Sequence, residues 1–181
     1  MSKKKVAKKA AKPKAAARRK AATKKVLPIP KGYHTVTPYL VVRNASDAIA
    51  FYKRAFGAKE KVRMAGPDGR VMHAEITIGD SHVMLGDEMP QMGATAPQTI
   101  GGTATSLFLY VRDVDKLFAQ ATGAGATVEM PPTDMFWGDR YCKMADPFGH
   151  KWSIGTHIED VTPKEMARRG AEAMAQQAHQ A

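Results

Sequence analysis

Residues 36–86 read VTPYLVVRNASDAIAFYKRAFGAKEKVRMAGPDGRVMHAEITIGDSHVMLG, and residues 105–155 repeat their pattern. Six anchors keep one register, with offsets of 66 to 70 residues between the copies. These anchors pair Val42 with Val111, Gly57 with Gly125, Met64 with Met130, Arg70 with Arg140, Gly79 with Gly149, and Gly86 with Gly155. Such a repeat indicates one supersecondary unit used twice, each unit having an apolar face that it cannot bury alone.

The first copy predicts a strand, a helix and three further strands. The strands are expected at residues 37–42, 61–64, 71–78 and 82–85. Apolar side chains between residues 49 and 56 recur at three- and four-residue spacing, which predicts an amphipathic helix. Asn44 or Ser46 is expected to cap its N-terminus, and Gly57 is expected to end it.

The second copy repeats this order. Its strands are expected at residues 106–111, 127–130, 140–144 and 151–154. Asp113 is expected to cap the helix, and Gly123 and Gly125 to end it. Each copy therefore reads βαβββ, and the predicted fold class is α+β, with two βαβββ modules forming a cupped sheet. A capping box at Thr162-Pro163-Lys164-Glu165 predicts a further, C-terminal helix.

Charge separates the first residues from the rest of the chain. Residues 1–32 hold 13 of the 28 Lys and Arg and none of the 17 Asp and Glu. Because this tail has few large apolar side chains, we expect it to be disordered. It is either simply solvated or associates nonspecifically with nucleic acid through residues 3–25. The predicted domains are this tail, a folded domain at 33–160 with modules at about 36–93 and 104–157, and a C-terminal helix and tail at 161–181.

The chain contains no signal for a membrane or for secretion. No run of about 18 apolar residues is present, and no apolar segment follows the basic start. The single Cys142 has no partner for an internal disulfide, so the expected location is the reducing cytoplasm and the expected role of Cys142 is that of a small core residue.

Alternation along each strand assigns its side chains to two faces. In the first copy the side chains expected beneath the helix are Pro38, Leu40, Val42, Ala74, Ile76, Ile78, Val83 and Leu85. Those expected on the opposite face are Thr37, Tyr39, His73, Glu75, Thr77, His82 and Met84. In the second copy the side chains expected beneath the helix are Leu107, Leu109 and Val111. Those expected opposite are Ser106, Phe108, Tyr110, Tyr141, Lys143 and Ser153. The opposite faces predict a cavity lined by aromatic rings and a few polar groups.

Four motifs carry a family resemblance. They are Val36-Thr37-Pro38-Tyr39-Leu40, His73-Ala74-Glu75-Ile76, Asp134-Met135-Phe136-Trp137-Gly138-Asp139-Arg140-Tyr141 and Asp146-Pro147-Phe148-Gly149-His150. With them the chain resembles the vicinal oxygen chelate superfamily of glyoxalases, extradiol dioxygenases and bleomycin-resistance proteins, and more narrowly its PhnB-like glyoxalase/bleomycin-resistance branch. The resemblance spans residues 33 to about 160 and implies a homodimer.

The resemblance also implies where a metal would be held. The metal enzymes of the superfamily place His, Gln or Glu on the first and last strand of each module, and those positions fall here on Thr37, Met84, Ser106 and Ser153. None of these is a plausible ligand for a divalent cation, so no metal is expected there. His73 and Glu75 lie two apart on one strand and remain open to three roles: a metal site, a polar pair that orients a ligand or transfers a proton, or a structural pair.

Aromatic residues supply the other candidate ligand contacts. The expected ligand-binding residues are Tyr39, Ser106, Phe108, Tyr110, Phe136, Trp137 and Tyr141, with Phe136 and Trp137 acting either as a lid or as plugs. Asp139 and Arg140 are expected to form a turn pair, with anion recognition by Arg140 as the alternative, and His82 is expected to be too exposed to contribute.

Three functions follow from these residues and the resemblance. The first is a glyoxalase/bleomycin-resistance-like protein that binds a small aromatic or planar molecule without a cofactor. The second is a lyase or isomerase that uses His73 and Glu75 for proton transfer or metal binding. The third is association with nucleic acid through the tail. The sequence leaves open whether the protein is an enzyme.

Overall fold

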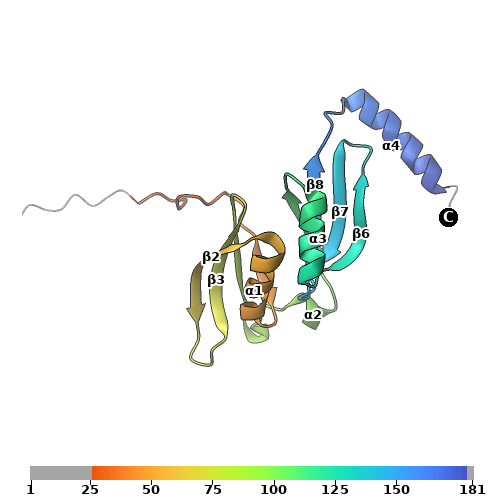
Figure 1. Ribbon diagram of the computed structural model, residues 1–181. Helices are drawn as coiled ribbons and strands as arrows, with labels where there is room; N and C mark the ends of the chain where they lie inside the picture. Colours follow the sequence, from red (N-terminus) through yellow and green to blue (C-terminus); the bar gives the residue numbers. More distant parts are fainter. Residues whose placement is uncertain (1–25, 179–181) are drawn as a thin grey trace, which may run out of the picture.

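The computed structural model describes residues 26–178 and contains two modules built to one plan (Figure 1). The first module consists of β1 (Tyr39–Val42), α1 (Ala45–Phe56), β2 (Lys59–Ala65), β3 (Val71–Ile78) and β4 (Ser81–Asp87). The second consists of β5 (Ser106–Tyr110), α3 (Val114–Ala124), β6 (Thr127–Asp134), β7 (Asp139–Ala145) and β8 (Lys151–His157). A C-terminal helix, α4 (Pro163–Ala178), follows. The predicted α+β class with two βαβββ modules is confirmed. Most of the predicted basic tail, including residues 3–25, lies outside the described residues.

Each module forms a four-stranded mixed sheet. The strand orders are β1-β4-β3-β2 and β5-β8-β7-β6. The first strand of each module runs parallel to the last, and the other neighbours are antiparallel. Figure 1 shows α1 and α3 side by side in the middle of the molecule, with β2 and β3 on one side and β6, β7 and β8 on the other. The modules therefore meet through their helices.

The segment between the modules contains two helical turns that the sequence did not predict. They are η1 (Pro90–Met92) and α2 (Pro97–Ile100). Each begins with a proline in its first turn and ends at a glycine in the left-handed region. Segments of three or four residues are too short to show helical periodicity, which is why pattern analysis misses them.

Side-chain capping fixes where the two module helices begin. Of the two predicted caps of α1, Asn44 is the residue used: its side chain accepts a hydrogen bond from the backbone N–H of Asp47. Asp113 caps α3 in the same way through the N–H of Lys116. Gly57 ends α1 with a φ of 65°, a conformation that glycine adopts at low cost.

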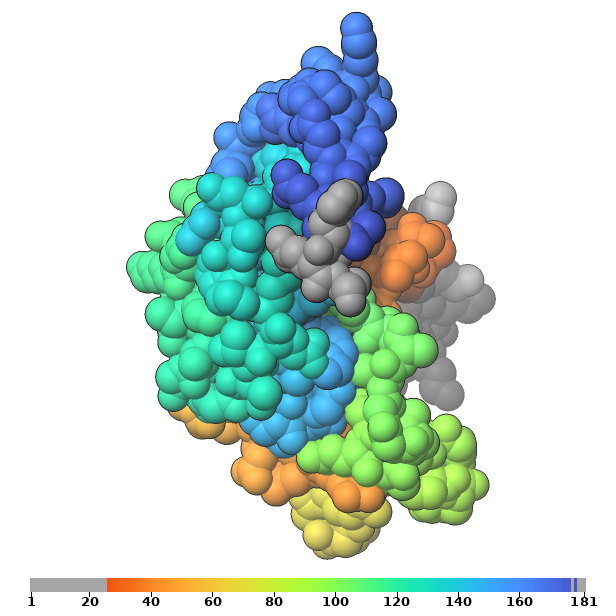
Figure 2. Space-filling view, turned by 90° about the vertical axis from the view of Figure 1, so that its right-hand side faces the viewer, coloured from red at the N-terminus to blue at the C-terminus, as the bar shows by residue number. Residues whose placement is uncertain are grey.

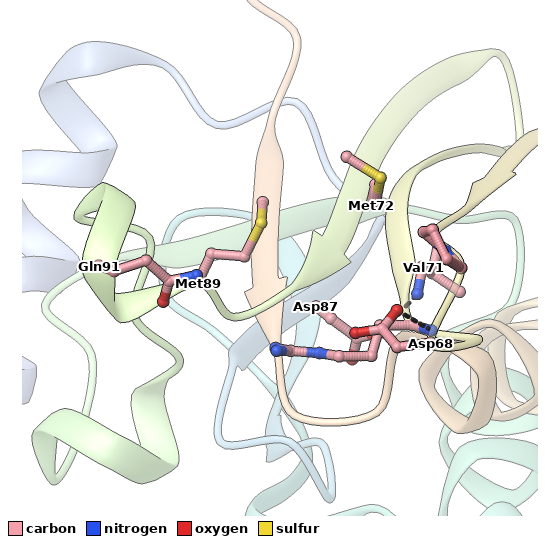
Figure 3. A pocket seen from close by; sticks show the side chains of 9 residues that line it. Asp68, Val71, Met72, Asp87, Met89 and Gln91 are labelled. Atoms are coloured by element: carbon pink, nitrogen blue, oxygen red, sulfur yellow. Dashed lines mark hydrogen bonds between the residues drawn. The ribbon is translucent and has the colours of Figure 1, made fainter.

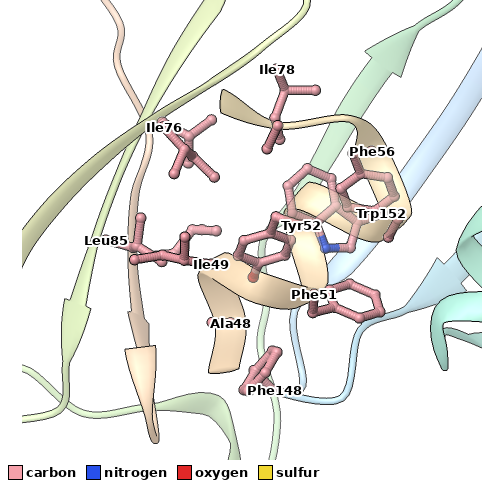
Figure 4. Close-up of a cluster of buried hydrophobic side chains, with 14 of the residues drawn as sticks. Ala48, Ile49, Phe51, Tyr52, Phe56, Ile76, Ile78, Leu85, Phe148 and Trp152 are labelled. Carbon is pink, nitrogen blue, oxygen red and sulfur yellow. The ribbon is translucent and has the colours of Figure 1, made fainter. Parts of the chain in front are cut away.

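The hydrophobic core lies between the sheets and around the helices. Seven of the eight residues of the predicted apolar face of module one are buried: Leu40, Val42, Ala74, Ile76, Ile78, Val83 and Leu85. The eighth, Pro38, is partly buried. In module two Leu107, Leu109 and Val111 are partly buried against the core. Figure 4 shows Trp152 of β8 against Tyr52 and Phe56 of α1, with ring centroids 5.6 and 4.7 Å apart. One continuous core thus joins the modules.

One buried carboxylate links the modules through hydrogen bonds. Asp146, 4% exposed, accepts from the Tyr52 hydroxyl at 2.7 Å and from Trp152 Nε1 at 2.9 Å, both at Oδ2. Its Oδ1 accepts from the backbone N–H groups of Phe148 and His150, each at 2.9 Å. The Asp-Pro-Phe-Gly turn therefore also supplies the polar centre of the interface between modules.

Two further predictions concern Cys142 and the C-terminal helix. Cys142 is fully buried, as predicted, and burial raises the pKa of its thiol to about 11.

Helix α4 begins at the predicted capping box, where Thr162 Oγ1 accepts from the N–H of Glu165 at 3.3 Å. Arg169 of α4 pairs with Glu159 and Glu165. Figure 2 shows α4 in dark blue at one end of the molecule, above the strands of module two. Within residues 26–178 no helix is long and apolar enough to cross a membrane.

Candidate functional site

Four aromatic rings gather on the face of module two that lies opposite its helix. We call Phe108, Tyr110, Trp137 and Tyr141 the aromatic platform. The ring centroid of Phe108 lies 4.7 Å from that of Tyr110 and 5.7 Å from that of Tyr141. The rings of Trp137 and Tyr141 meet edge to face, with centroids 5.7 Å apart. These four predicted ligand-binding residues are therefore brought together.

The polar atoms of these rings are held by the protein. The Tyr110 hydroxyl and Trp137 Nε1 donate to Oδ2 of Asp139 at 3.0 and 3.2 Å, and Asp139 is only 4% exposed. The Tyr141 hydroxyl lies 2.8 Å from Ser153 Oγ, which in turn lies 3.1 Å from Ser106 Oγ. Because the polar ends are satisfied from behind, the rings are oriented and leave mainly apolar surface for a ligand.

A glycine makes room for the platform. Gly155 of β8 stands opposite Tyr110 of β5 and Tyr141 of β7. A Cβ added at Gly155 would lie 3.1 Å from the ring of Phe108. Gly86, the residue of module one that corresponds to Gly155 in the repeat, likewise leaves space for an aromatic side chain: a Cβ there would lie 2.8 Å from the Tyr39 hydroxyl. In both copies the glycine of the last strand thus accommodates an aromatic side chain of the first, through its hydroxyl in Tyr39 and its ring in Phe108.

The platform is an open surface in this chain. Phe108 is 46% exposed and Tyr110 68% exposed, whereas Tyr141 is buried. The sequence left open whether the predicted cavity is built from one chain or shared by two, and within this single chain neither Phe108 nor Tyr110 is covered. Tyr141, the buried member of the platform, and its hydrogen-bond partner Ser153 offer a ligand little surface of their own.

Phe136 and Trp137 point to different surroundings. Trp137 joins the platform, whereas Phe136 packs against α4, its ring 3.3 Å from where a Cβ of Gly170 would lie. The two rings meet edge to face at 5.1 Å, so Phe136 supports Trp137. The structure does not place Phe136 on the platform.

The predicted turn pair of Asp139 and Arg140 is wrong. Arg140 binds Asp115 through two nitrogens at 2.6 and 2.7 Å and Asp134 at 2.8 Å. These carboxylates raise the pKa of its guanidinium. Asp139 points to the other side of β7, as alternation requires, and serves the platform.

His157 was missed by sequence analysis. Its Nδ1 lies 2.8 Å from Oδ1 of Asp139, and its Nε2 lies 3.0 Å from Asp160. Asp160 and then Asp139 raise the pKa of His157 above its ordinary value. The predicted strand ended at residue 154, three residues before His157, so alternation was not applied to it. A longer strand would have placed His157 on the face of Ser153.

The polar candidates of module one also lie together. We call Tyr39, His73, Glu75 and His82 the polar face. His73 Nε2 lies 3.2 Å from Glu75 Oε1, and the rings of His73 and Tyr39 are 5.8 Å apart. The register pairs Glu75 with Met84 and Thr77 with His82 across β3 and β4, as alternation predicted.

The segment before β1 covers part of the polar face. The Tyr33 hydroxyl donates to Glu75 Oε2, and the Tyr33 ring stacks on His82 with centroids 4.2 Å apart. This hydrogen bond is the main cause that lowers the pKa of Glu75 and raises the pKa of Tyr33. The prediction that His82 is too exposed is wrong, because Tyr33 and Gly32 cover it. Sequence analysis missed Tyr33, which precedes the first strand and has no periodic pattern.

Comparison with known proteins shows the family to which this chain belongs. The family model described as the Glyoxalase/Bleomycin resistance protein/Dioxygenase superfamily matches residues 32–154. The chain belongs to this superfamily. Uncharacterized protein Rv0887c of Mycobacterium tuberculosis is 46% identical over 134 residues, which cover 72% of this chain and 79% of that protein. Protein YjdN of Escherichia coli is 28% identical over 150 residues, which cover 70% of this chain and 98% of that protein.

Solved structures share the superfamily fold. TioX from Micromonospora sp. ML1 has a TM-score of 0.56 at 28% identity, covering 67% of this chain and 97% of its own. A putative 3-demethylubiquinone-9 3-methyltransferase, PhnB protein, from Bacillus cereus has a TM-score of 0.53 at 17% identity, covering 68% of this chain and 99% of its own. The latter likeness is one of fold alone.

The positions at which members of the superfamily would hold a metal do not suit one here. Thr37, Met84, Ser106 and Ser153 carry no imidazole, carboxylate or thiolate, and the two serines are hydrogen-bonded to each other. Among residues 26–178 no three His, Cys, Asp or Glu side chains gather in a way that suits a metal. The residues at these positions therefore do not fit a metal.

A separate cavity of about 390 Å³ lies at the far end of module one (Figure 3). It is lined by Gly66, Pro67, Asp68, Arg70, Val71, Met72, Asp87, Met89 and Gln91. Asp87 is used structurally, because its oxygens accept from the backbone N–H groups of Ala45 and Val71. A β-bulge at Met72, between the pairs Met64–His73 and Ala65–Val71, turns Met72 outward. None of the predicted site residues lines this cavity.

Proposed function

We propose that this member of the superfamily binds a small planar or aromatic molecule on the aromatic platform. The observation that supports this most is the combination of exposed ring faces and satisfied polar ends. Phe108 and Tyr110 remain about half exposed or more, although their neighbours hold them in place. Contiguous exposed apolar surface of this kind marks interaction sites. Stacking on such rings adds roughly 0.5–1.5 kcal/mol per pair beyond the area that is buried.

The test is a titration followed by nuclear magnetic resonance of the indole N–H groups. The chain has two tryptophans, Trp137 on the platform and Trp152 in the core. With 2-naphthol as the probe we expect a saturable shift of the Trp137 signal and little change at Trp152. Decahydro-2-naphthol carries the same hydroxyl on a nonplanar skeleton and should give a much smaller shift. Equal shifts with both probes, or no shift at Trp137, would refute the proposal.

Variants of the platform sharpen this test. Phe108→Ala should weaken 2-naphthol binding, and Gly155→Ala should do so without removing any ring, because its methyl group would displace Phe108. Met174→Ala is the matched control, since Met174 is a 71% exposed apolar side chain on α4. If all three variants bind the probe equally, the platform is not the site.

A second candidate function is proton transfer by His73 and Glu75. The specific observation in its favour is their 3.2 Å contact on the partly covered polar face. A lyase or isomerase of this kind would exchange a carbon-bound proton of its substrate with D₂O. This exchange should be lost in His73→Gln. Exchange that survives this substitution would remove His73 from the reaction.

We also propose the homodimer that the superfamily resemblance implies. β1 pairs only with β4 and β5 only with β8 within the described residues, so each sheet has an unpaired edge. Unpaired edges and the open platform are surfaces that a second copy would cover. Light scattering after gel filtration should give twice the monomer mass of 19.7 kDa. A mass of one chain at all concentrations would rule the dimer out.

A third proposal is nonspecific association of the basic tail with nucleic acid. Residues 1–32 hold no acidic side chain, and dense positive charge binds polyanions through counterion release. Filter binding of the full chain to DNA should be strong at low salt and lost at high salt, whereas a chain that starts at Tyr33 should not bind. Equal binding of both chains would contradict this proposal.

A further inference from the structure

The segment before β1 places a phenol on the polar face of module one. The Tyr33 hydroxyl donates to one oxygen of Glu75, while His73 lies 3.2 Å from the other oxygen. The Tyr33 ring lies on the ring of His82 at 4.2 Å with an interplanar angle of 23°. The polar face therefore offers a carboxylate acceptor and a stacking surface, spaced to receive one phenol ring with its hydroxyl.

The contact with Tyr33 is what ties this segment to the sheet. Within residues 26–178, the hydrogen bond from Tyr33 to Glu75 is the one that joins residues 26–36 to β3, and their other hydrogen bonds stay within the segment or its junction with β1. Val26 and Leu27 are 89% and 64% exposed, so no apolar packing holds the start of the segment. One side chain thus determines whether the polar face is covered.

Covering the face leaves one polar atom without a partner. His82 Nδ1 is buried and has no hydrogen-bond partner within residues 26–178. Gly32, with a φ of 90°, approaches so closely that a Cβ there would lie 3.2 Å from His82 Cε1. An unpaired buried nitrogen opposes closure, because water could bind it when the segment lifts away.

We propose that the polar face of module one is a phenol-binding site whose resident occupant is Tyr33, and that free phenols compete with Tyr33 for it. The ligand hydroxyl donates to Glu75, the ligand ring stacks on His82, and His73 holds the carboxylate in place. Glu75 is suited to this role because its Oε2 already accepts the hydroxyl of Tyr33, while its Oε1 lies 3.2 Å from His73 Nε2. The site uses no residue of the aromatic platform, so it does not rest on the function proposed there.

The test compares 4-fluorophenol with fluorobenzene, which lacks the hydroxyl, by ¹⁹F resonance titration of the full chain. Removing the tethered occupant in Tyr33→Ala should tighten binding of 4-fluorophenol by about tenfold, because a covered face lowers the apparent affinity. Tyr33→Phe keeps the stacking ring but loses the hydroxyl, and it should give a smaller gain. Thr35→Ala is the matched control, since Thr35 is an exposed neighbour in the same segment. It should bind 4-fluorophenol as the unmodified chain does.

Two further measurements locate the site. Adding Glu75→Gln to Tyr33→Ala should abolish most of the gain, and the ring signals of His82 should shift on titration. Adding Phe108→Ala to Tyr33→Ala should leave the gain unchanged, which separates this site from the platform. Equal affinity of the unmodified chain and Tyr33→Ala, equal binding of both probes to Tyr33→Ala, or a gain that depends on Phe108 would each overturn the inference.

Discussion

Replacing Asp146 by asparagine should test whether this carboxylate joins the two modules. The substitution keeps the shape of the side chain but replaces one acceptor oxygen with an NH₂ group. If the NH₂ occupies the Oδ2 position, it faces the Tyr52 hydroxyl and Trp152 Nε1. The hydroxyl can turn and accept, whereas the indole N–H can only donate and is left unpaired. If the NH₂ occupies the Oδ1 position instead, two backbone N–H groups lose their acceptor.

The expected magnitude follows from the less costly orientation. A buried donor without a partner costs about 1–3 kcal/mol, and the remaining bonds lose the contribution of a charged acceptor. Relief of the buried charge offsets part of this, so we expect Asp146→Asn to lower the free energy of unfolding by about 2 kcal/mol. Tyr52→Phe removes a single donor to the same oxygen and should cost about 1.5 kcal/mol. Because both changes act on one oxygen, their effects should not add in the double variant.

Urea unfolding followed by circular dichroism measures these differences, with the slope of the transition compared between variants. Asp160→Asn is the control, since Asp160 carries the same chemical change on a fully exposed side chain, and it should stay within about 0.5 kcal/mol of the unmodified chain. If Asp146→Asn also stayed within that range, the hydrogen bonds of Asp146 would not be what holds the modules together, and apolar packing of Trp152 would carry the interface alone.

Three other predictions follow from single side chains. Hydrogen bonds from Arg63 and Lys53 lower the pKa of Glu60 to about 2. The contribution of these ion pairs to the stability of the folded chain is therefore present above pH 4.5 and is lost as pH falls toward 2. Glu60→Gln should flatten the stability curve in that window by less than about 1 kcal/mol, because the pair is screened by solvent; an unchanged curve would show that the pair contributes nothing. Cys142 should resist iodoacetamide at pH 8 until the chain unfolds, and labelling of the native protein would contradict its burial and raised pKa. Gly138→Ala should destabilise the loop before β7, because its φ is 95° and a Cβ would lie 2.1 Å from the carbonyl oxygen of Glu159; unchanged unfolding in urea would exclude this clash.

Strand alternation predicted the two faces of module one because its strands keep a period of two over most of their length. It assigned Ala74 and Ile76 to the core and His73 and Glu75 to the opposite side, and both assignments hold. The exception is Met72, where a bulge adds one residue and reverses the alternation. A bulge depends on pairing with the neighbouring strand, which a single strand's pattern does not record.

His157 was missed because the predicted strand ended before it, whereas the other missed features depend on contacts between distant elements. The hydrogen bond from Tyr33 to Glu75 joins residues 42 positions apart in the sequence, and the one from Tyr110 to Asp139 joins residues 29 positions apart. Nothing in the local pattern around Asp139 distinguishes a turn residue from a buried acceptor, so the adjacent Arg140 was taken as its partner. The Phe-Trp-Gly-Asp-Arg motif marked the right region, but the roles of its residues came only from the fold.

The two modules share one fold but differ in how the carboxylate on the face opposite the helix finds its hydrogen-bond partner. In each, a glycine of the last strand makes room for an aromatic side chain of the first, Gly86 for the hydroxyl of Tyr39 and Gly155 for the ring of Phe108. In module two the carboxylate that orients the rings belongs to the sheet itself, so the aromatic platform is set whenever the module is folded. In module one the carboxylate is on the sheet, but the ring that satisfies it comes from a segment outside the sheet. Within one chain, a ligand of the aromatic platform meets the exposed rings of Phe108 and Tyr110, whereas a ligand of the polar face must first displace Tyr33. Occupancy of the polar face therefore depends on the conformation of the segment that carries Tyr33, and that of the platform does not.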